Sequence, residues 1–214
     1  MYKAVIFDLD GVLVDTTHYH FLAWKHVADQ EGIHIDAKFN ETLKGIDRMN
    51  SLERILASGN KPYTDTQKYA LAEKKQDYYK QLISDISIDN LLPGAYSTLA
   101  KLRNHKIRTG LASVSKNSGF ILEKLGIRYL FDHVICGSPT MTSKPSPEIF
   151  LHVAKNLHVN PEECIAVEDS IAGIEAIKAA KMYAVGIGDP SILHHADRVI
   201  QDLRGFLQLI PAWV

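Results

Sequence analysis

Two aspartates, Asp8 and Asp10, stand directly after a short apolar run and are separated by a single leucine. The run, residues 4–7, is apolar at every position, which is typical of a strand buried on both faces of a parallel sheet. In open α/β sheets, ligands bind beyond the carboxyl ends of the strands. Because two carboxylates at such an end repel each other, we expect a divalent cation with oxygen ligands to hold them charged. A solvated polar turn is the alternative, since Asp and Gly11 are common turn residues.

A second expected strand, residues 107–112, ends in hydroxyl, amide and ammonium groups that lead into a helix. Backbone N–H groups at a helix start, together with such side chains, favour an anion. Ser and Asn are also ordinary helix caps, so the same segment allows a purely structural interpretation. The candidate phosphate-binding residues here are Ser113, Val114, Ser115, Lys116 and Asn117.

Two more strand ends carry charged residues. Lys144 lies between a strand at residues 133–136 and a helix that opens at Pro147, where its ammonium can reach a phosphate oxygen. Glu168 and Asp169 follow an apolar strand at residues 164–167. Adjacent acids at a buried strand end are costly unless they share a cation, although a surface lysine and a solvated turn are the alternatives.

The elements that must position these residues alternate between strand and helix over residues 91–190, which implies a parallel sheet with right-handed crossovers. Residues 36–85 contain no strand-like run and predict helices near 39–43, 51–57 and 66–84, with Ser51 as a helix cap. We therefore expect an α/β fold, a Rossmann-like parallel sheet core with an inserted all-helical cap domain. The core is predicted to comprise residues 1–14 and 91–214, and the cap residues 15–90.

Composition excludes several classes of protein. The 214 residues carry a net charge of −1, so no overall field attracts nucleic acid or an anionic membrane. Two cysteines provide no disulfide framework and suit a reducing compartment. The start of the sequence does not resemble a signal peptide, and no apolar stretch is long enough to span a bilayer. The sequence predicts a cytoplasmic monomer that acts on a small molecule.

The four strand ends together resemble the motifs of the haloacid dehalogenase superfamily of phosphotransferases: D-x-D-G-V-L-x-D, a serine, a lysine and an acidic pair. The resemblance implies that Asp8 is phosphorylated and that Asp10 is a general acid/base. It also implies that Lys144 and Ser113 hold the phosphate oxygens. Mg²⁺ would be bound by Asp8, the backbone carbonyl of Asp10 and Asp169, with Glu168 assisting. Lys144-Pro145 is expected to form a sharp turn, for which a cis peptide bond is available.

Within this superfamily, three further stretches resemble the β-phosphoglucomutase family: H-x-x-x-W, L-K-G-x-x-R and A-S-x-S-K-N. The resemblance implies interconversion of β-glucose 1-phosphate and glucose 6-phosphate through β-glucose 1,6-bisphosphate. Arg48 on the cap, with Ser115, Lys116 and Asn117 on the core, would bind the second phosphate. Asp47 departs from the small polar residue expected beside Arg48. The candidate substrate-contacting residues of the cap are His20, Trp24, Lys44, Gly45, Ser51 and Lys75.

Two other functions fit parts of the pattern. A Mg²⁺-dependent sugar-phosphate phosphatase would share the core but would need no second phosphate site. A phospho-accepting signalling module also places acids and Mg²⁺ at parallel strand ends, although the helical insertion and Asp10 argue against it.

Overall fold

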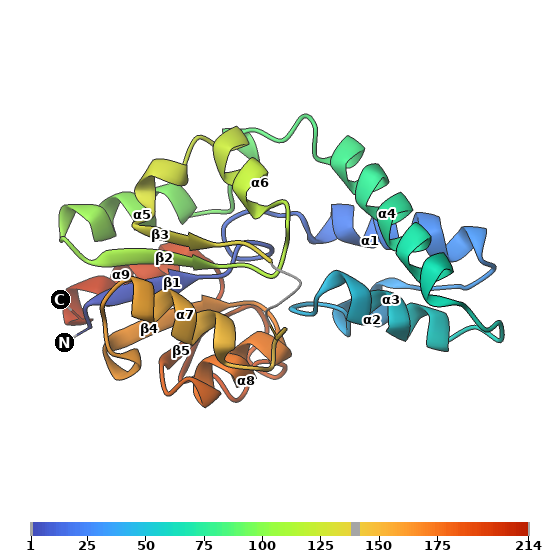
Figure 1. The fold of residues 1–214 in the computed structure, drawn as a ribbon. Coiled ribbons are helices and arrows are strands. Elements are labelled where there is room, and N and C mark those ends of the chain that lie inside the picture. The colour runs from blue at the N-terminus through green and yellow to red at the C-terminus, as the bar shows by residue number, and fades with distance from the viewer. Residues whose placement is uncertain (1, 138–141, 214) are drawn as a thin grey trace.

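A six-stranded parallel sheet forms the centre of the larger lobe (Figure 1). The computed structural model describes residues 2–137 and 142–213. Strand order is β3-β2-β1-β4-β5-β6, so β1, which leads into Asp8, lies between β2 and β4. The strands are β1 Ala4–Phe7, β2 Arg108–Ala112, β3 His133–Ile135, β4 Cys164–Glu168, β5 Tyr183–Ile187 and β6 Arg198–Ile200.

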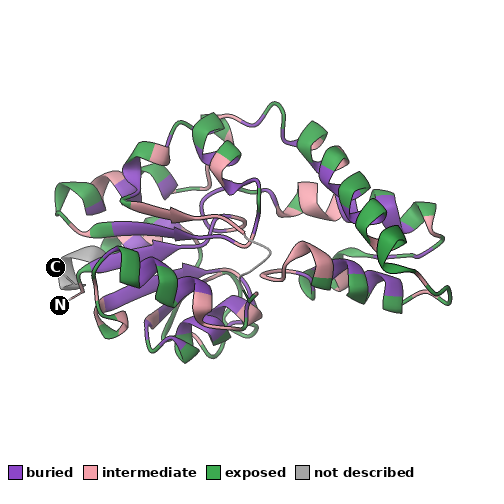
Figure 2. Ribbon diagram, in the orientation of Figure 1, coloured by how far each residue is buried: buried purple, intermediate pink, exposed green. Residues whose placement is uncertain are grey.

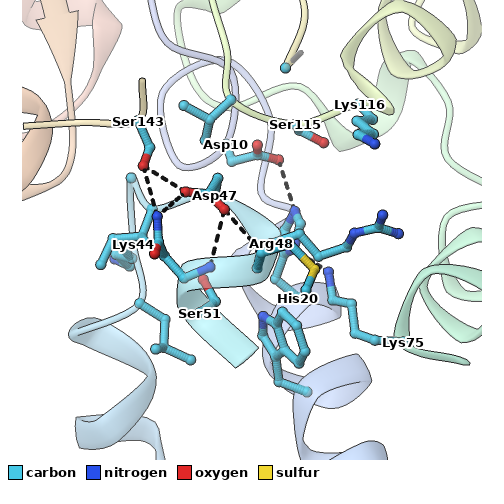
Figure 3. A pocket seen from close by; sticks show the side chains of 18 of the residues that line it. Asp10, His20, Lys44, Asp47, Arg48, Ser51, Lys75, Ser115, Lys116 and Ser143 are labelled. Atoms are coloured by element: carbon cyan, nitrogen blue, oxygen red, sulfur yellow. Dashed lines mark hydrogen bonds and ion pairs between the residues drawn. The ribbon is translucent and has the colours of Figure 1, made fainter. Parts of the chain in front are cut away.

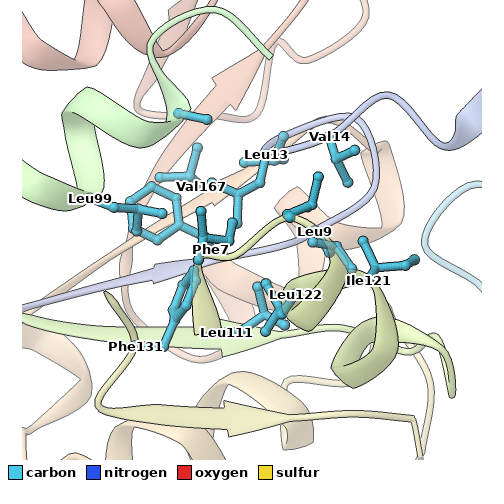
Figure 4. Close-up of a cluster of buried hydrophobic side chains, with 14 of the residues drawn as sticks. Phe7, Leu9, Leu13, Val14, Leu99, Leu111, Ile121, Leu122, Phe131 and Val167 are labelled. Carbon is cyan, nitrogen blue, oxygen red and sulfur yellow. The ribbon is translucent and has the colours of Figure 1, made fainter. Parts of the chain in front are cut away.

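Both faces of the sheet are buried, as the continuous apolar strands require. On one face of the sheet, Val5 and Phe7 pack in a hydrophobic cluster with residues of α5, α6 and α9. On the other face, Ala4 and Ile6 pack in a second cluster with residues of α7 and α8. Figure 4 shows Phe7 at the centre of the first cluster. The helices of this lobe are α5 Ala95–Asn104, α6 Ser118–Lys124, α7 Glu148–Asn156, α8 Ile171–Ala179 and α9 Leu203–Trp213, with 3-10 turns at Ile88–Asn90, Arg128–Leu130 and Pro161–Glu163.

Four helices form the smaller lobe, which we call the cap (Figures 1 and 2). They are α1 Thr17–Gln30, α2 Ala37–Glu41, α3 Arg48–Ala57 and α4 Asp65–Leu82. Their buried faces enclose a separate hydrophobic cluster that includes Trp24, Leu52, Ile55 and Leu71. Ala23 of α1 and Tyr79 of α4 belong instead to the cluster that contains Phe7 of the sheet.

The two chain crossings between core and cap lie side by side. Val14 forms an antiparallel bridge with Leu91, and the Leu92 N–H donates to the carbonyl of Leu13 at 2.9 Å. Paired crossings of this kind restrict the cap to movement about one junction. The division into core and cap at residues 14 and 91 stays a prediction, and this bridge lies beside it.

The predicted α/β fold with a helical cap is confirmed, and most predicted elements begin and end within a few residues of the observed ones. The prediction that Ser51 caps a helix was wrong. The helix α3 begins at Arg48, and Asp47 caps it by accepting hydrogen bonds from the N–H groups of Met49 and Asn50. Ser51 is instead buried within the helix and lines the cavity described below. Among the described residues, no helix has the length and apolar character to cross a membrane.

Candidate active site

Lys144 links two buried carboxylates at the carboxyl edge of the sheet. Its Nζ lies 2.7 Å from Asp8 Oδ1 and also contacts Glu168 Oε1. The peptide bond between Lys144 and Pro145 is cis, which agrees with the turn predicted from the sequence. Burial alone would lower the pKa of Lys144, but Asp8 and Glu168 outweigh it and raise the pKa above its usual value. The ammonium therefore carries a permanent positive charge beside Asp8.

The second oxygen of Glu168 is held by the start of α8. It accepts hydrogen bonds from the N–H groups of Asp169 and Ser170, both at 2.9 Å, and from the Ser170 hydroxyl at 2.8 Å. Gly173 makes this approach possible, because a Cβ there would lie 2.0 Å from the Glu168 carboxyl carbon. Both oxygens of Glu168 thus have partners, and Glu168 serves in this arrangement as a fixed counter-ion for Lys144.

Asp8, Glu168 and Asp169 form a group that fits a divalent cation. One oxygen from each carboxylate lies within 4.8 Å of the other two, and carboxylate oxygens are the ligands that Mg²⁺ prefers. Burial, with Glu168 adding to it, raises the pKa of Asp169 to about 7. Burial likewise raises the pKa of Asp8 well above its usual value, although Lys144 opposes the rise. A cation bound among these carboxylates would oppose the rise in both pKa values.

Asp10 lies next to the cap rather than in this acidic group. It accepts a hydrogen bond from the Thr16 hydroxyl, and its Oδ1 is 3.7 Å from His20 Nε2. Burial opposes ionisation of Asp10, but His20 and Thr16 outweigh it and lower its pKa. Lys75 Nζ in turn lies 2.9 Å from His20 Nδ1. The contacts therefore run from Lys75 on α4 through His20 on α1 to Asp10, the predicted acid/base.

Lys75 is buried between aromatic rings. Its Nζ lies 4.9 Å from the centroid of the Trp24 ring and 4.5 Å from that of Tyr79, and Tyr79 stacks on His20 with ring centroids 4.1 Å apart. Burial lowers the pKa of Lys75 to about 7. Burial and the Lys75 charge also lower the pKa of His20.

The loop after β2 forms one wall of the site. Ser113 is fully buried, and its hydroxyl accepts a hydrogen bond from the Ser115 N–H at 3.1 Å. Asn117 also belongs to this wall, and its Oδ1 accepts a hydrogen bond from Gln76 Nε2 of the cap at 2.6 Å. Lys116 is exposed at the rim. The wall thus presents polar groups to the space beneath the cap.

Arg48 and Lys44 contribute positive charge from the cap (Figure 3). Arg48 Nη1 lies 2.8 Å from Glu73 Oε1, and its Nε is buried without a hydrogen-bond partner among residues 2–137 and 142–213. Lys44 Nζ lies 3.2 Å from Asp169 Oδ2, so it reaches across to the core. Gly45 permits that reach: its φ is +73°, and a Cβ there would lie 2.7 Å from Ser170 Oγ.

A cavity of about 510 Å³ lies between cap and core. Ser113, Lys144 and Glu168 do not line it but lie buried around its floor. The other predicted site residues line its walls: Asp8, Asp10, His20, Trp24, Lys44, Gly45, Arg48, Ser51, Lys75, Val114, Ser115, Lys116, Asn117 and Asp169.

Known proteins resemble this chain in sequence and in fold. The model of the haloacid dehalogenase-like hydrolases matches residues 2–181. The chain belongs to the haloacid dehalogenase-like hydrolase family. It is 47% identical to a β-phosphoglucomutase of Bacillus subtilis, over 93% of this chain and 89% of that protein. A crystal structure of β-phosphoglucomutase from Clostridium difficile superposes with a TM-score of 0.95 at 45% identity, covering 100% of this chain and 97% of the other. A fructose-1-phosphate phosphatase of Escherichia coli is 29% identical, over 87% of this chain and 96% of that protein.

Several residues in or around the cavity were not identified from the sequence; Gln76 and Ser143 line it, whereas Thr16 and Glu73 do not. Thr16, Gln76 and Glu73 contact predicted site residues, and Ser143 forms a hydrogen bond with Asp47. Thr16 had a local signal, because it stands at the start of a helix shortly after the aspartate motif. The other three act through contacts between segments distant in sequence, which local patterns do not encode.

Proposed function

We propose that this protein is a phosphomutase that interconverts β-D-glucose 1-phosphate and D-glucose 6-phosphate through β-glucose 1,6-bisphosphate. One observation carries the proposal: the chain matches β-phosphoglucomutases over nearly its whole length, cap included. The cavity is consistent with it, because it lies between Lys144 at the core end and Arg48 on the cap. A hexose with a phosphate at each end needs positive charge at both ends.

In the first half of the proposed reaction, Asp8 acts as the nucleophile. One of its oxygens attacks phosphorus in line, the bond to the leaving sugar oxygen breaks, and an aspartyl phosphate forms. Lys144 and the Ser113 hydroxyl hold the non-bridging oxygens, whose charge grows in the loose transition state. Asp8, the backbone carbonyl of Asp10 and Asp169 would hold Mg²⁺, with Glu168 fixing Lys144 beside them. The bound ion supplies further neutralisation of phosphoryl charge.

Asp10 moves the proton in both halves. Its lowered pKa leaves it ionised at neutral pH, which is the form that removes a proton from the sugar hydroxyl attacking the phosphoenzyme. The same proton is then available for the leaving oxygen when the bisphosphate has reoriented. His20, close to Asp10 and paired with Lys75, keeps Asp10 directed toward the cavity.

The bisphosphate must bind in two orientations, so one phosphate always occupies the distal end. We assign Arg48, Ser115, Lys116 and Asn117 to this distal phosphate. His20, Trp24, Lys44, Gly45, Ser51 and Lys75 would surround the sugar. Closure of the cap excludes water from the phosphoenzyme and so favours the sugar hydroxyl as acceptor. We further propose that a small sugar phosphate is the binding partner and that the protein acts as a cytoplasmic monomer.

A sugar-phosphate phosphatase is the second candidate, favoured by the likeness to a fructose-1-phosphate phosphatase. The two functions are separated by incubating the protein with Mg²⁺ and β-glucose 1-phosphate, with and without a bisphosphate primer. Glucose 6-phosphate that appears faster with the primer supports the mutase. Stoichiometric glucose and free phosphate would support the phosphatase and overturn the proposal.

A further inference from the structure

The side chain of Asp47 makes hydrogen bonds on both sides of the boundary between cap and core. Its Oδ1 caps α3, accepting from the N–H groups of Met49 at 2.9 Å and Asn50 at 3.1 Å. Its Oδ2 accepts from the Asn50 amide at 2.5 Å and from the hydroxyl of Ser143 at 2.6 Å. Ser143 belongs to the core and is separated from Asp47 by 96 positions in the sequence. Figure 3 shows the two side chains directed toward each other across the cavity rim.

The contact joins two neighbours of the phosphate-binding groups. Asp47 directly precedes Arg48, and Ser143 directly precedes Lys144. We propose that Asp47 and Ser143 form a clasp that holds the cap closed and sets the spacing between Arg48 and Lys144. The part of this inference that concerns phosphate spacing rests on the proposed function, whereas the closure itself does not.

Asn50 Nδ2 also lies 3.4 Å from Ser143 Oγ, beside the clasp. Further contacts between cap and core involve groups that a ligand would occupy. Lys44 pairs with Asp169, a proposed metal ligand, and Gln76 pairs with Asn117, a proposed phosphate ligand. Cation and bisphosphate binding would draw on both of those core residues. Asp47 and Ser143 have no such assignment, so their contact can persist in the loaded enzyme.

The aspartate is required by geometry. An N-cap needs a single acceptor oxygen, which serine provides as well as aspartate does. A carboxylate has two oxygens, so one caps the helix while the other remains available to Ser143. Hydrogen bonds from Ser143 and Asn50 outweigh the effect of burial and lower the pKa of Asp47, which keeps both oxygens as acceptors at neutral pH. The small polar residue expected from the family resemblance has a single side-chain oxygen, so it could not cap α3 with one oxygen and contact Ser143 with another.

Two single variants isolate the clasp from the helix cap. Asp47→Ser keeps a capping oxygen and removes the contact, and Ser143→Ala removes it from the other side. Asp36→Ser is the matched control, because Asp36 caps α2 through the Phe39 N–H at 2.7 Å within the cap. Thermal unfolding of each variant confirms that it is folded.

Small-angle X-ray scattering of the ligand-free proteins measures closure. We expect a larger radius of gyration for Asp47→Ser and Ser143→Ala, and the wild-type value for Asp36→Ser. The KM for β-glucose 1,6-bisphosphate should rise roughly tenfold in each single variant, more than kcat falls, and no further in the double variant. Wild-type scattering in both variants would overturn the clasp, as would additive effects in the double variant.

A changed radius with an unchanged KM would overturn the spacing role alone. If the wild-type protein forms no glucose 6-phosphate while the two variants still open, the proposed function fails and the closing contact stands.

Discussion

The substitution Arg48→Ala tests the distal phosphate site. Arg48 is largely buried, with a side chain 19% exposed, and its Nε has no hydrogen-bond partner among the described residues. Arg48 also lines the cavity, and its guanidinium has hydrogen-bonding capacity that the described residues do not use. Its ion pair with Glu73 involves a partner that is 63% exposed, and exposed pairs of this kind contribute little to stability. The variant should therefore fold normally.

The size of the effect follows from the contact that is lost. A hydrogen bond to a charged group contributes about 1.5–3 kcal/mol, and about 1.4 kcal/mol corresponds to a factor of ten. Removing Arg48 should weaken bisphosphate binding and mutase flux by roughly 10- to 150-fold. Phosphorylation of Asp8 by acetyl phosphate should be nearly unchanged, because acetyl phosphate has no second phosphate for Arg48 to bind.

Both rates are measured on the same preparations of wild type, Arg48→Ala and Arg54→Ala. Arg54 lies on the same helix, but it is exposed and donates to the carbonyl of Thr42 at 2.7 Å, away from the cavity. Its removal should leave both rates at the wild-type level. Equal losses of mutase flux and acetyl-phosphate turnover in Arg48→Ala would refute the distal assignment.

Three further predictions concern the core and its acid/base chain. Asp8→Asn should abolish turnover with every phosphate donor, because an amide is a poor nucleophile; phosphoenzyme detected by mass spectrometry in this variant would contradict the assignment. Asp10→Asn should bind the bisphosphate normally and slow both transfer steps by ~10²–10⁴-fold in rapid-quench experiments; transfer at the wild-type rate would give Asp10 another role. Lys75 titrates near pH 7 when folded and near 10.5 when unfolded, so the unfolded chain binds more protons across this window and the free energy of unfolding of the wild type rises with pH. Lys75→Met removes that slope, and denaturant titrations should find it more stable than wild type near pH 7, by at most about 5 kcal/mol, with the difference shrinking toward pH 10; a difference independent of pH would show that Lys75 is charged in the folded protein.

The sheet and its functional edge could be predicted because their signals are local. Buried parallel strands are continuous apolar runs, and the residue that follows each run must lie at the carboxyl edge. These signals predicted that Asp8, Lys144 and Glu168 lie together, and in the structure Asp8 and Glu168 both lie within hydrogen-bonding range of the Lys144 ammonium group. The short strand β6 and helix α9 were not predicted, because three residues provide too little periodicity and residues beyond 190 matched the family least.

The contacts of the cap could not be predicted in the same way. Periodicity identifies the buried face of a helix, but it does not determine how a separate helical unit sits on a sheet. The partners of Asp47, Lys44 and Gln76 depend on that placement. Asp47 illustrates the limit: the sequence identified it only as a departure from the family pattern, whereas the structure shows it as a helix cap with an additional contact to Ser143.

The most direct test of the mutase assignment follows the fate of a single phosphoryl group. Phosphoenzyme is prepared with acetyl phosphate and Mg²⁺, freed of excess donor, and mixed with β-glucose 1-phosphate or with buffer in a rapid-quench experiment. The mutase account predicts that the sugar accelerates loss of the aspartyl phosphate and that the group appears in β-glucose 1,6-bisphosphate and then glucose 6-phosphate. Release of the group as free phosphate, at the same rate with and without the sugar, would contradict it.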